Sequence, residues 1–474
     1  MARTMRRFLV SATHKSSGKT TVSVGLCAAL SARGLAVQPF KKGPDYIDPM
    51  WLAAAAGRPC FNLDPHLMDE AALRRCFEQG LSGAELALVE GNKGLYDGLA
   101  LDGSNSNAAV ARQLGLPVLL VIDARGMTRG IAPLILGYQA FERDIRIGGV
   151  ILNRVGGSRH ESKLRAVVEH YTSVPVLGAV AEDPRLAMTE RHLGLMPCAE
   201  VADAQARVQA IGAIVGAQVD LDRVRALAAS AAPLPAAGPR PPAPARQPDL
   251  RIGIARDRAF GFYYPDDLAA LEAAGAQLVP IDTLHDTRLP ALDGLFIGGG
   301  FPETCMAELE ANAALRGALR EAIVGGLPTY AECGGLMFLA RSITWQGRTA
   351  RMVGAIPGDA VMHARPVGRG YVQLQETAAM PWADGGSAPV RGHEFHHSSL
   401  ENLDPGVTFA YRVQRGHGID GQHDGVLVHN LLASYAHLRT DAGSRWAPRF
   451  MAYVRSRRDR HPAAAPCDAP ALTA

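Results

Sequence analysis

A cysteine followed by two glycines is the strongest chemical signal in this sequence. Residues 329–339 predict a short strand that ends at Cys333 and a helix that begins with Gly334 and Gly335. Glycines permit a tight strand-to-helix turn, and the helix start presents free N–H groups and favours a thiolate. Such a thiol can attack a carbonyl, and nearby amides can stabilise the oxyanion that forms. The pattern favours a thiol acyl-transfer site over a buried structural cysteine.

A thiol nucleophile needs a base, and the leading candidate is His437. It lies in the segment 431–439, late in the chain. Spacing along the sequence does not decide which imidazole reaches the thiol. The competing histidines are His393, His396, His397 and His429. The spacing in the stretch 393–397 suits a strand better than an HExxH helix, which disfavours a metal site there.

Glycines also follow an earlier apolar strand, within the stretch 296–303. The amides of Gly299 and Gly300, together with that of Gly334, can form an oxyanion and glutamine pocket for a carbonyl held against Cys333. The alternative interpretation is a glycine-rich turn without a ligand.

A phosphate-binding loop is predicted near the start of the chain, where residues 11–20 follow an apolar run and open a helical pattern. Backbone N–H groups of such a loop cradle phosphates at the helix N-terminus. The candidate ATP-binding residues of the loop are Thr13, Ser17, Gly18, Lys19 and Thr20. Lys19 would contact the β and γ phosphates, Thr20 would bind Mg²⁺, and Thr13 replaces the first glycine of the standard pattern. The alternative is an ordinary helix start capped by Ser17 or Thr20.

Acidic residues follow the next predicted strands, where loops of an open α/β sheet converge on the ligand. Glu90 is the candidate for binding Mg²⁺ together with Thr20, directly or through water. The other candidates for the synthetase and substrate site are Lys42, Asp45, Asp48 and Asp97. Ordinary turn chemistry is the alternative for each acid, because Gly-Pro-Asp and Tyr-Asp-Gly are common turn sequences. Asn153 ends a later strand, where its amide can read adenine or simply terminate the strand.

Two α/β domains are needed to position these residues. Before residue 230, apolar strands alternate with helical patterns, which predicts a parallel sheet covered on both faces. The predicted strands are 7–12, 36–41, 86–90, 118–123, 148–153 and 174–180, and a helix over 20–33 is closed by Gly34. After the linker, strands are predicted at 251–255, 277–281, 294–297 and directly before Cys333. The segments 372–375 and 407–411 suggest an antiparallel extension.

A proline- and alanine-rich stretch separates the two halves. We expect a synthetase domain over 1–230, an extended linker over 231–249, an amidotransferase domain over 250–455 and a disordered tail over 456–474. The arginine-rich stretch 455–458 is interpreted as solvated surface.

Composition excludes several classes of function. The formal net charge is +3, and no Lys/Arg run is long enough for a nucleic-acid footprint. No apolar stretch reaches membrane-spanning length, and the basic start leads directly into a strand, which disfavours a cleaved signal peptide. The 7 cysteines include no CxxC pair, which indicates reduced thiols in the cytoplasm. The expected partners are small-molecule substrates, without nucleic acid or membrane, and a homodimer is left open.

These motifs together resemble the cobyrinate a,c-diamide synthases, the glutamine-dependent amidases of corrin side chains. The resemblance runs from about residue 7 to residue 450 and includes the phosphate loop, the stretches 42–48, 90–98, 298–303 and 332–335, and the later stretches 392–396 and 433–437. It implies a P-loop domain of the dethiobiotin-synthetase type followed by a class I glutamine amidotransferase domain.

The resemblance implies a role for each candidate residue. Cys333 would be the nucleophile and His437 its activator; Thr20 and Glu90 would hold Mg²⁺. The acids at 45, 48 and 97 would lie in the synthetase site, and Asn153 near the base. Ammonia released from glutamine would then amidate a tetrapyrrole carboxylate that ATP has activated.

The sequence departs from this family two residues after His437. The corrin enzymes that it resembles typically carry a histidine at that position, and this chain has Arg439. Other class I amidotransferases often carry a glutamate there to orient the imidazole. Either another acid orients His437, or the pair works without one. The segment 434–439 also resembles a sub-branch linked to dissimilatory sulfite reductase, which makes sirohaem the alternative acceptor to cobyrinate. An alternative of another class is a P-loop switch with an inactive amidotransferase-like domain for partner binding.

Overall fold

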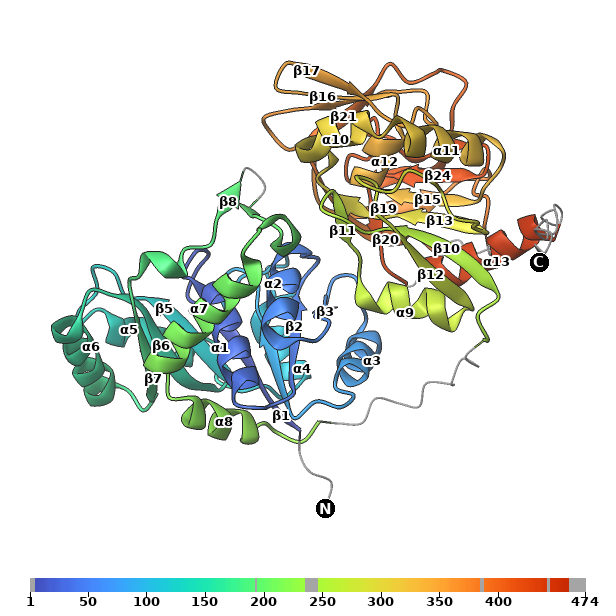
Figure 1. Ribbon diagram of the computed structural model, residues 1–474. Coiled ribbons are helices and arrows are strands. Elements are labelled where there is room, and N and C mark those ends of the chain that lie inside the picture. The colour runs from blue at the N-terminus through green and yellow to red at the C-terminus, as the bar shows by residue number, and fades with distance from the viewer. Residues whose placement is uncertain (1–4, 192–193, 235–245, 384–387, 441–443, 460–474) are drawn as a thin grey trace, which may run out of the picture. The chain divides into compact units, whose positions relative to one another are not determined.

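The computed structural model describes residues 5–191, 194–234, 246–383, 388–440 and 444–459. The chain divides into two compact units (Figure 1). Residues up to 241 and the segment 264–266 form the first unit; residues 242–263 and those from 267 onward form the second.

The first unit contains a parallel sheet of seven strands over the described residues, in the order β3-β2-β4-β1-β5-β6-β7. Its strands are β1 (Arg6–Ala12), β2 (Val37–Lys42), β3 (Phe61–Leu63), β4 (Leu86–Glu90), β5 (Val118–Asp123), β6 (Ile147–Val155) and β7 (Val176–Ala181). The six predicted strands are confirmed to within two residues. Strand β3 was not predicted, because three residues are too few to carry a pattern.

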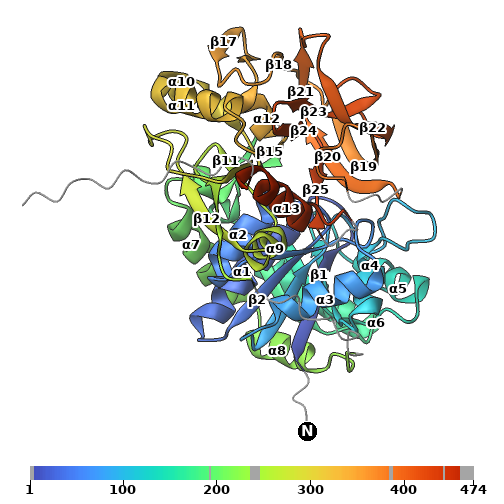
Figure 2. The ribbon, with the colours of Figure 1, turned by 90° about the vertical axis from the view of Figure 1, so that its right-hand side faces the viewer.

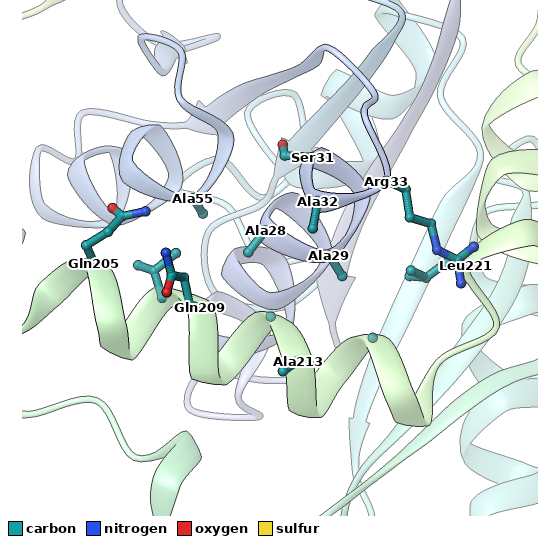
Figure 3. A pocket seen from close by; sticks show the side chains of 13 residues that line it. Ala28, Ala29, Ser31, Ala32, Arg33, Ala55, Gln205, Gln209, Ala213 and Leu221 are labelled. Atoms are coloured by element: carbon teal, nitrogen blue, oxygen red, sulfur yellow. The ribbon is translucent and has the colours of Figure 1, made fainter.

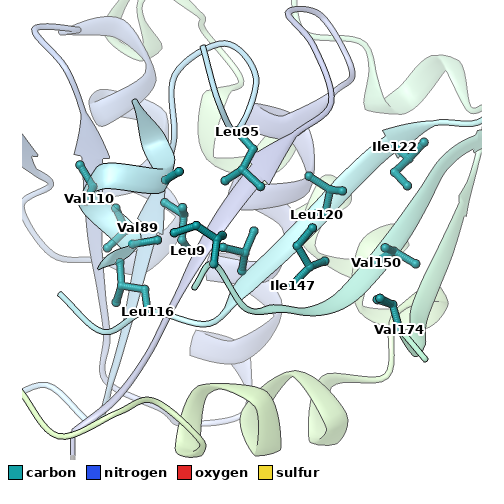
Figure 4. Close-up of a cluster of buried hydrophobic side chains, with 14 of the residues drawn as sticks. Leu9, Val89, Leu95, Val110, Leu116, Leu120, Ile122, Ile147, Val150 and Val174 are labelled. Carbon is teal, nitrogen blue, oxygen red and sulfur yellow. The ribbon is translucent and has the colours of Figure 1, made fainter. Parts of the chain in front are cut away.

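Helices cover both faces of this sheet. One face is covered by α1 (Lys19–Ala32), α2 (Ile47–Ala56), α7 (Ala204–Gln218) and α8 (Leu221–Ala229). The other face is covered by α3 (Glu70–Gly80), α4 (Asn107–Gln113), α5 (Ile131–Phe141) and α6 (Ser158–Tyr171). Because successive strand residues point to opposite faces, Phe8 and Val10 pack under α1 and Leu9 joins the opposite core with Val89 and Leu120 (Figure 4). The predicted three-layer α/β fold is confirmed for this unit.

The second unit contains a mixed sheet of ten strands over the described residues, in the order β12-β10-β13-β15-β24-β23-β22-β19-β20-β25. The parallel part consists of β12 (Ala276–Ile281), β10 (Leu250–Ala255), β13 (Gly294–Ile297), β15 (Thr329–Glu332) and β24 (Leu431–Ser434). The antiparallel part consists of β23 (His423–Val428), β22 (Thr408–Arg415), β19 (Gly368–Glu376), β20 (Val390–His396) and β25 (His437–Leu438). The predicted antiparallel extension is confirmed.

Helices and a small sheet complete the second unit (Figure 2). The second unit has two hydrophobic cores. Side chains of α9 (Pro265–Ala273) and α13 (Trp446–Arg458) lie in the first core. Side chains of α10 (Met306–Ala311), α11 (Ala313–Val324) and α12 (Gly334–Leu339) lie in the second core. The small sheet has the order β17 (Arg348–Arg351), β16 (Ser342–Trp345), β18 (Asp359–Met362) and β21 (Ser398–Glu401). A two-stranded ribbon pairs β11 (Phe260–Phe262) with β14 (Gly299–Gly300).

The end of the second unit differs from the prediction. Helix α13 continues to Arg458, past the expected boundary at residue 455. Arg455, which we interpreted as solvated surface, donates to both carboxylate oxygens of Asp249 at 2.6 and 2.9 Å. This ion pair ties the last helical turn to the start of β10. Residues 235–245 of the expected linker and 460–474 of the expected tail lie outside the described residues.

No helix among the described residues is long and apolar enough to cross a membrane.

Candidate functional site

Cys333 lies on the strand-to-helix turn that the sequence predicts. Strand β15 ends at Glu332, Cys333 adopts φ 47° and ψ −101°, and α12 begins at Gly334. The amide of Cys333 donates to the carbonyl of Ser434 at 2.8 Å, which ties the turn to the end of β24. A positive φ is strained for a residue with a Cβ, and such strain is typical of a nucleophile elbow.

His437 is the imidazole that reaches Cys333. It lies on β25 and forms a side-chain hydrogen bond with Cys333. Burial alone would lower the pKa of His437, but its hydrogen bonds to Cys333 and Glu332 raise that pKa to about 10. The ring therefore carries a proton at neutral pH, and an imidazolium beside a thiol favours the nucleophilic thiolate.

Glu332 is a residue of this site that we did not identify from the sequence. Its Oε2 lies 3.2 Å from Nδ1 of His437, and both side chains are buried. In a regular strand, consecutive side chains point to opposite faces. Strand alternation alone therefore gives no sign that residue 332 reaches the same ring as Cys333.

The competing histidines have other environments. His393 stacks on His437 with ring centroids 4.9 Å apart, and burial together with the charge of His437 holds its pKa well below the usual range. His396 stacks on Tyr435 at 3.9 Å. His397 contacts the carbonyl of His363, and His429 lies in the turn between β23 and β24. Among the described residues, no group of three or more His, Cys, Asp or Glu side chains could hold a metal ion.

The predicted oxyanion glycines lie around the turn. A Cβ added to Gly299 would lie 2.6 Å from Cε1 of His437, and one added to Gly334 would lie 2.8 Å from the carbonyl oxygen of Gly300. Gly334 begins α12, so its N–H has no partner within the helix and can serve an oxyanion. The amide of Gly298 instead donates to the hydroxyl of Tyr263 at 3.0 Å.

Asp424 is a second buried acid that we did not identify from the sequence. Its oxygens accept from the hydroxyl of Ser434 at 2.7 Å and from the amides of Tyr435 and Ala436 at 3.0 Å each. Burial raises its pKa. It holds the chain that leads from β24 into His437.

In the first unit, the predicted phosphate loop joins β1 to α1. Gly18, the residue before α1, adopts φ 82°, and the hydroxyl of Ser17 donates to the carbonyl of His14 at 2.9 Å. The amide of Thr13 donates to the carbonyl of Val121. Asn153 lies against this loop, because its Nδ2 donates to the carbonyl of Ser17 at 2.8 Å. Its amide nitrogen therefore braces the loop.

A cluster of charges lies beside the loop. Thr20 Oγ1 lies 2.8 Å from Glu90 Oε1 and 3.3 Å from Asp48 Oδ2. Lys41 donates to Asp48 and, at 3.0 Å, to Glu90 Oε1, while Lys19 Nζ lies 3.7 Å from the same oxygen. Burial alone would lower the pKa of Lys41, but the surrounding carboxylates raise it well above the usual value.

The residues present fit a divalent cation. Glu90 is fully buried, and its Oε2 has no hydrogen-bond partner within the part of the chain that the structure describes. Mg²⁺ is typically bound by one or two carboxylates together with substrate phosphates. Oxygen atoms of Thr20, Asp48 and Glu90 lie together at the start of α1, as such a site requires.

Two of the remaining predicted synthetase residues, Asp45 and Asp97, hold turns. Asp45 Oδ1 accepts from the amides of Ile47 at 2.9 Å and Asp48 at 3.1 Å, so it caps α2, and burial and Asp48 raise its pKa to about 7. Asp97 accepts from the amide of Gly94 at 2.9 Å. Lys42 is buried at the end of β2, and burial lowers its pKa. Both acids thus adopt the turn geometry that we considered as the alternative.

Replacing Lys41 by methionine should lower the free energy of unfolding by about 3 kcal/mol. The change removes the cation that donates to both Asp48 and Glu90 and leaves Lys19 at 3.7 Å from Glu90. Removing one partner of a buried charge pair is strongly destabilising. We expect Mg²⁺ to restore more stability to this variant than to the wild type, because ligands that bind the folded state stabilise it. Urea unfolding with and without Mg²⁺ measures both effects. The exposed Lys163→Met variant is the control, and equal stability of both variants would contradict the prediction.

A groove of about 480 Å³ lies elsewhere on the first unit, between the later turns of α1 and most of the length of α7 (Figure 3). Small side chains such as Ala28, Ala32 and Ala213 line it, with Arg33 and Gln209. The described residues that line it include no carboxylate, thiol or imidazole.

Two family models match this chain, and each covers one of the two sites. The CobQ/CobB/MinD/ParA nucleotide binding domain matches residues 8–195, and the CobB/CobQ-like glutamine amidotransferase domain matches residues 251–444. A solved glutamine amidotransferase aligns over 43% of this chain and 98% of its own, at 18% identity and a TM-score of 0.33.

Relatives match over nearly the whole chain. The chain is 47% identical to a cobyrinate a,c-diamide synthase of Magnetococcus marinus, over 95% of this chain and 97% of that protein. It is 43% identical to one of Methanosarcina acetivorans, over 91% and 92%. It is 37% identical to one of Listeria monocytogenes, over 92% and 96%.

The fold and the two sites define a glutamine amidotransferase with a nucleotide-binding domain on the same chain. The chain belongs to the cobyrinate a,c-diamide synthase family.

Proposed function

We propose that this chain is an ATP- and glutamine-dependent ligase that converts the a and c acetate carboxylates of cobyrinate into amides. The observation that carries the proposal is the presence, on one chain, of a Cys333–His437 pair and of a phosphate loop beside an acidic cluster. The full-length relatives named cobyrinate a,c-diamide synthase support this acceptor. A reactive thiol and ATP as a substrate both favour the cytoplasm as the compartment.

The second unit supplies ammonia. The thiolate of Cys333 attacks the side-chain carbonyl of glutamine, and the amide of Gly334 stabilises the oxyanion. His437 gives its proton to the departing ammonia and then takes one from water, which hydrolyses the thioester to glutamate. The strained turn presents the thiol for this attack.

The first unit activates the acceptor. The loop amides bind the phosphates of ATP, and Lys19 neutralises charge that develops as the terminal phosphoryl group passes to the carboxylate. Ammonia then displaces phosphate and forms the amide. Mg²⁺, held by Thr20 and Glu90 with Asp48 nearby, would supply additional neutralisation of phosphate charge. We assign positioning of the acceptor to Lys42, at the end of β2, and to Asp97.

The alternative of a P-loop switch with an inactive second domain has less support. The buried network of Glu332, His437 and Cys333 is built to activate a thiol, and a module that only binds a partner does not need one.

Mass spectrometry after parallel incubation with cobyrinate and with sirohaem tests the proposal. With ATP, Mg²⁺ and glutamine, we expect conversion of two carboxylates of cobyrinate into amides. If sirohaem is amidated and cobyrinate is not, the acceptor in the proposal is wrong and the proposed amidation chemistry stands. Absence of glutamate release from glutamine, with or without an acceptor, would reject the enzyme itself.

A further inference from the structure

We propose that Glu332, the residue directly before the nucleophile, is the acid that positions His437 in the glutaminase site. This inference rests on the proposed glutaminase chemistry. It assigns to β15 the role that amidotransferases of this class often give to a glutamate two residues after the histidine, where this chain carries Arg439.

The contacts of Glu332 account for both of its carboxylate oxygens. Oε2 accepts from Nδ1 of His437 at 3.2 Å. Oε1 accepts from the amide of Leu438 at 3.0 Å and from the hydroxyl of Tyr330 at 2.7 Å. The carboxylate is buried and therefore cannot rotate away without losing these partners. It holds the imidazole and the backbone of the next residue together.

The backbone of Cys333 explains how two consecutive residues reach one ring. Strand β15 pairs in parallel with β24, with Glu332 opposite Ser434, three residues before His437. In a continued strand, the side chains of Glu332 and Cys333 would point to opposite faces. The turn at φ 47° and ψ −101° ends the strand and redirects the thiol. Both side chains can therefore form hydrogen bonds with His437.

The nitrogen assignment follows from these contacts. Because Nδ1 faces Glu332, Nε2 is the nitrogen left for Cys333. The Nδ1 proton stays on the ring throughout the reaction, whereas the Nε2 proton moves to the departing ammonia and is replaced from the attacking water. Glu332 itself exchanges no proton, so it is a positioning residue that also stabilises the imidazolium.

Other groups around the ring do not provide this charge. His393 stacks on the ring and is uncharged in the neutral range, because burial and the neighbouring charges of His437 and Arg439 hold its pKa well below 6.5. The side chain of Arg439 is buried and carries the wrong sign to stabilise an imidazolium. Glu332 is the acid whose hydrogen bond raises the pKa of His437.

The test compares Glu332→Gln with the wild type. We expect kcat for glutamine hydrolysis to fall by roughly 10²–10⁴-fold, the range seen when the acid of a catalytic triad is neutralised, with little change in KM for glutamine. Amidation from added ammonium should persist. The pKa of His437, followed by ¹⁵N NMR of labelled histidine, should fall from about 10 toward its ordinary value.

Glu394→Gln is the matched control, because Glu394 is a buried carboxylate of the same unit that accepts from the amides of His417 and Gly418. It should lower stability and leave the pKa of His437 unchanged. If Glu332→Gln keeps kcat, or loses kcat with an unchanged pKa of His437, the inference is overturned.

The wild type provides a second measurement in case Glu332→Gln does not fold. A His437 ring that is neutral at pH 8, or that lacks the Nδ1 proton, would also overturn the inference. A wild type without glutaminase activity would reject the proposed function instead, and the NMR readout of the Glu332 contact would still stand.

Discussion

Replacing Cys333 by alanine should abolish amidation from glutamine and preserve amidation from ammonium ion. The expected loss of glutamine hydrolysis is roughly 10⁴–10⁶-fold, as found when a covalent nucleophile is removed from a catalytic unit. Alanine keeps the Cβ, so the turn at φ 47° is no more strained than in the wild type. The proposed synthetase site in the first unit is unchanged, so we expect ammonia from solution to replace ammonia from glutamine.

Two assays of the same preparation measure this effect: glutamate release, and amide formation with ammonium ion in place of glutamine. Cys198→Ala is the control, because Cys198 is a half-buried thiol of the first unit. Equal loss of both activities in Cys333→Ala would contradict a scheme of two separate sites.

Replacing Lys19 by alanine should abolish most amidation and preserve glutamine hydrolysis. Amidation should fall by roughly 10³-fold or more with either nitrogen source, because Lys19 supplies charge stabilisation at the transferring phosphoryl group. Glutamine hydrolysis takes place in the second unit, so it should continue in this variant. Lys19 is held near Glu90 in the structure, at 3.7 Å, and its loss leaves Lys41 beside that carboxylate.

Lys163→Ala, an exposed lysine on α6, is the control for the loss of one positive charge from the first unit. Acceptor-dependent ADP formation, glutamate release and amide formation should be measured together. Retention of amidation in Lys19→Ala would contradict the proposed role of the phosphate loop in activating the acceptor.

Most of the fold could be predicted because parallel strands buried on both faces leave continuous apolar runs. Strands β4, β5 and β13 begin and end where their runs do. Strand β3 was missed because its three residues carry no period. The order of the antiparallel strands, with β25 paired to β20, depends on contacts distant in the sequence, which no local pattern specifies.

The chemistry-bearing residues were easier to predict than their contacts. Cys333 and Lys19 stand in local motifs whose backbone geometry follows from glycines and a helix start. Glu332 was missed because its contact with His437 joins residues 105 apart in the sequence, which no local pattern specifies. Lys41 ends the predicted strand 36–41, but its position between two carboxylates comes from the pairing of β2 with β4.

One wall around the nucleophile consists of backbone. Gly334 lies so close to Gly300, and Gly299 so close to the ring of His437, that a single methyl group at either glycine would overlap its neighbour. Any side chain there would have to displace main chain or the catalytic imidazole. Attempts to engineer a different nitrogen donor should therefore leave these glycines unchanged and vary the residues that approach Cys333 from other elements. In laboratory evolution, substitutions at both positions should be eliminated even when the selection demands a larger donor.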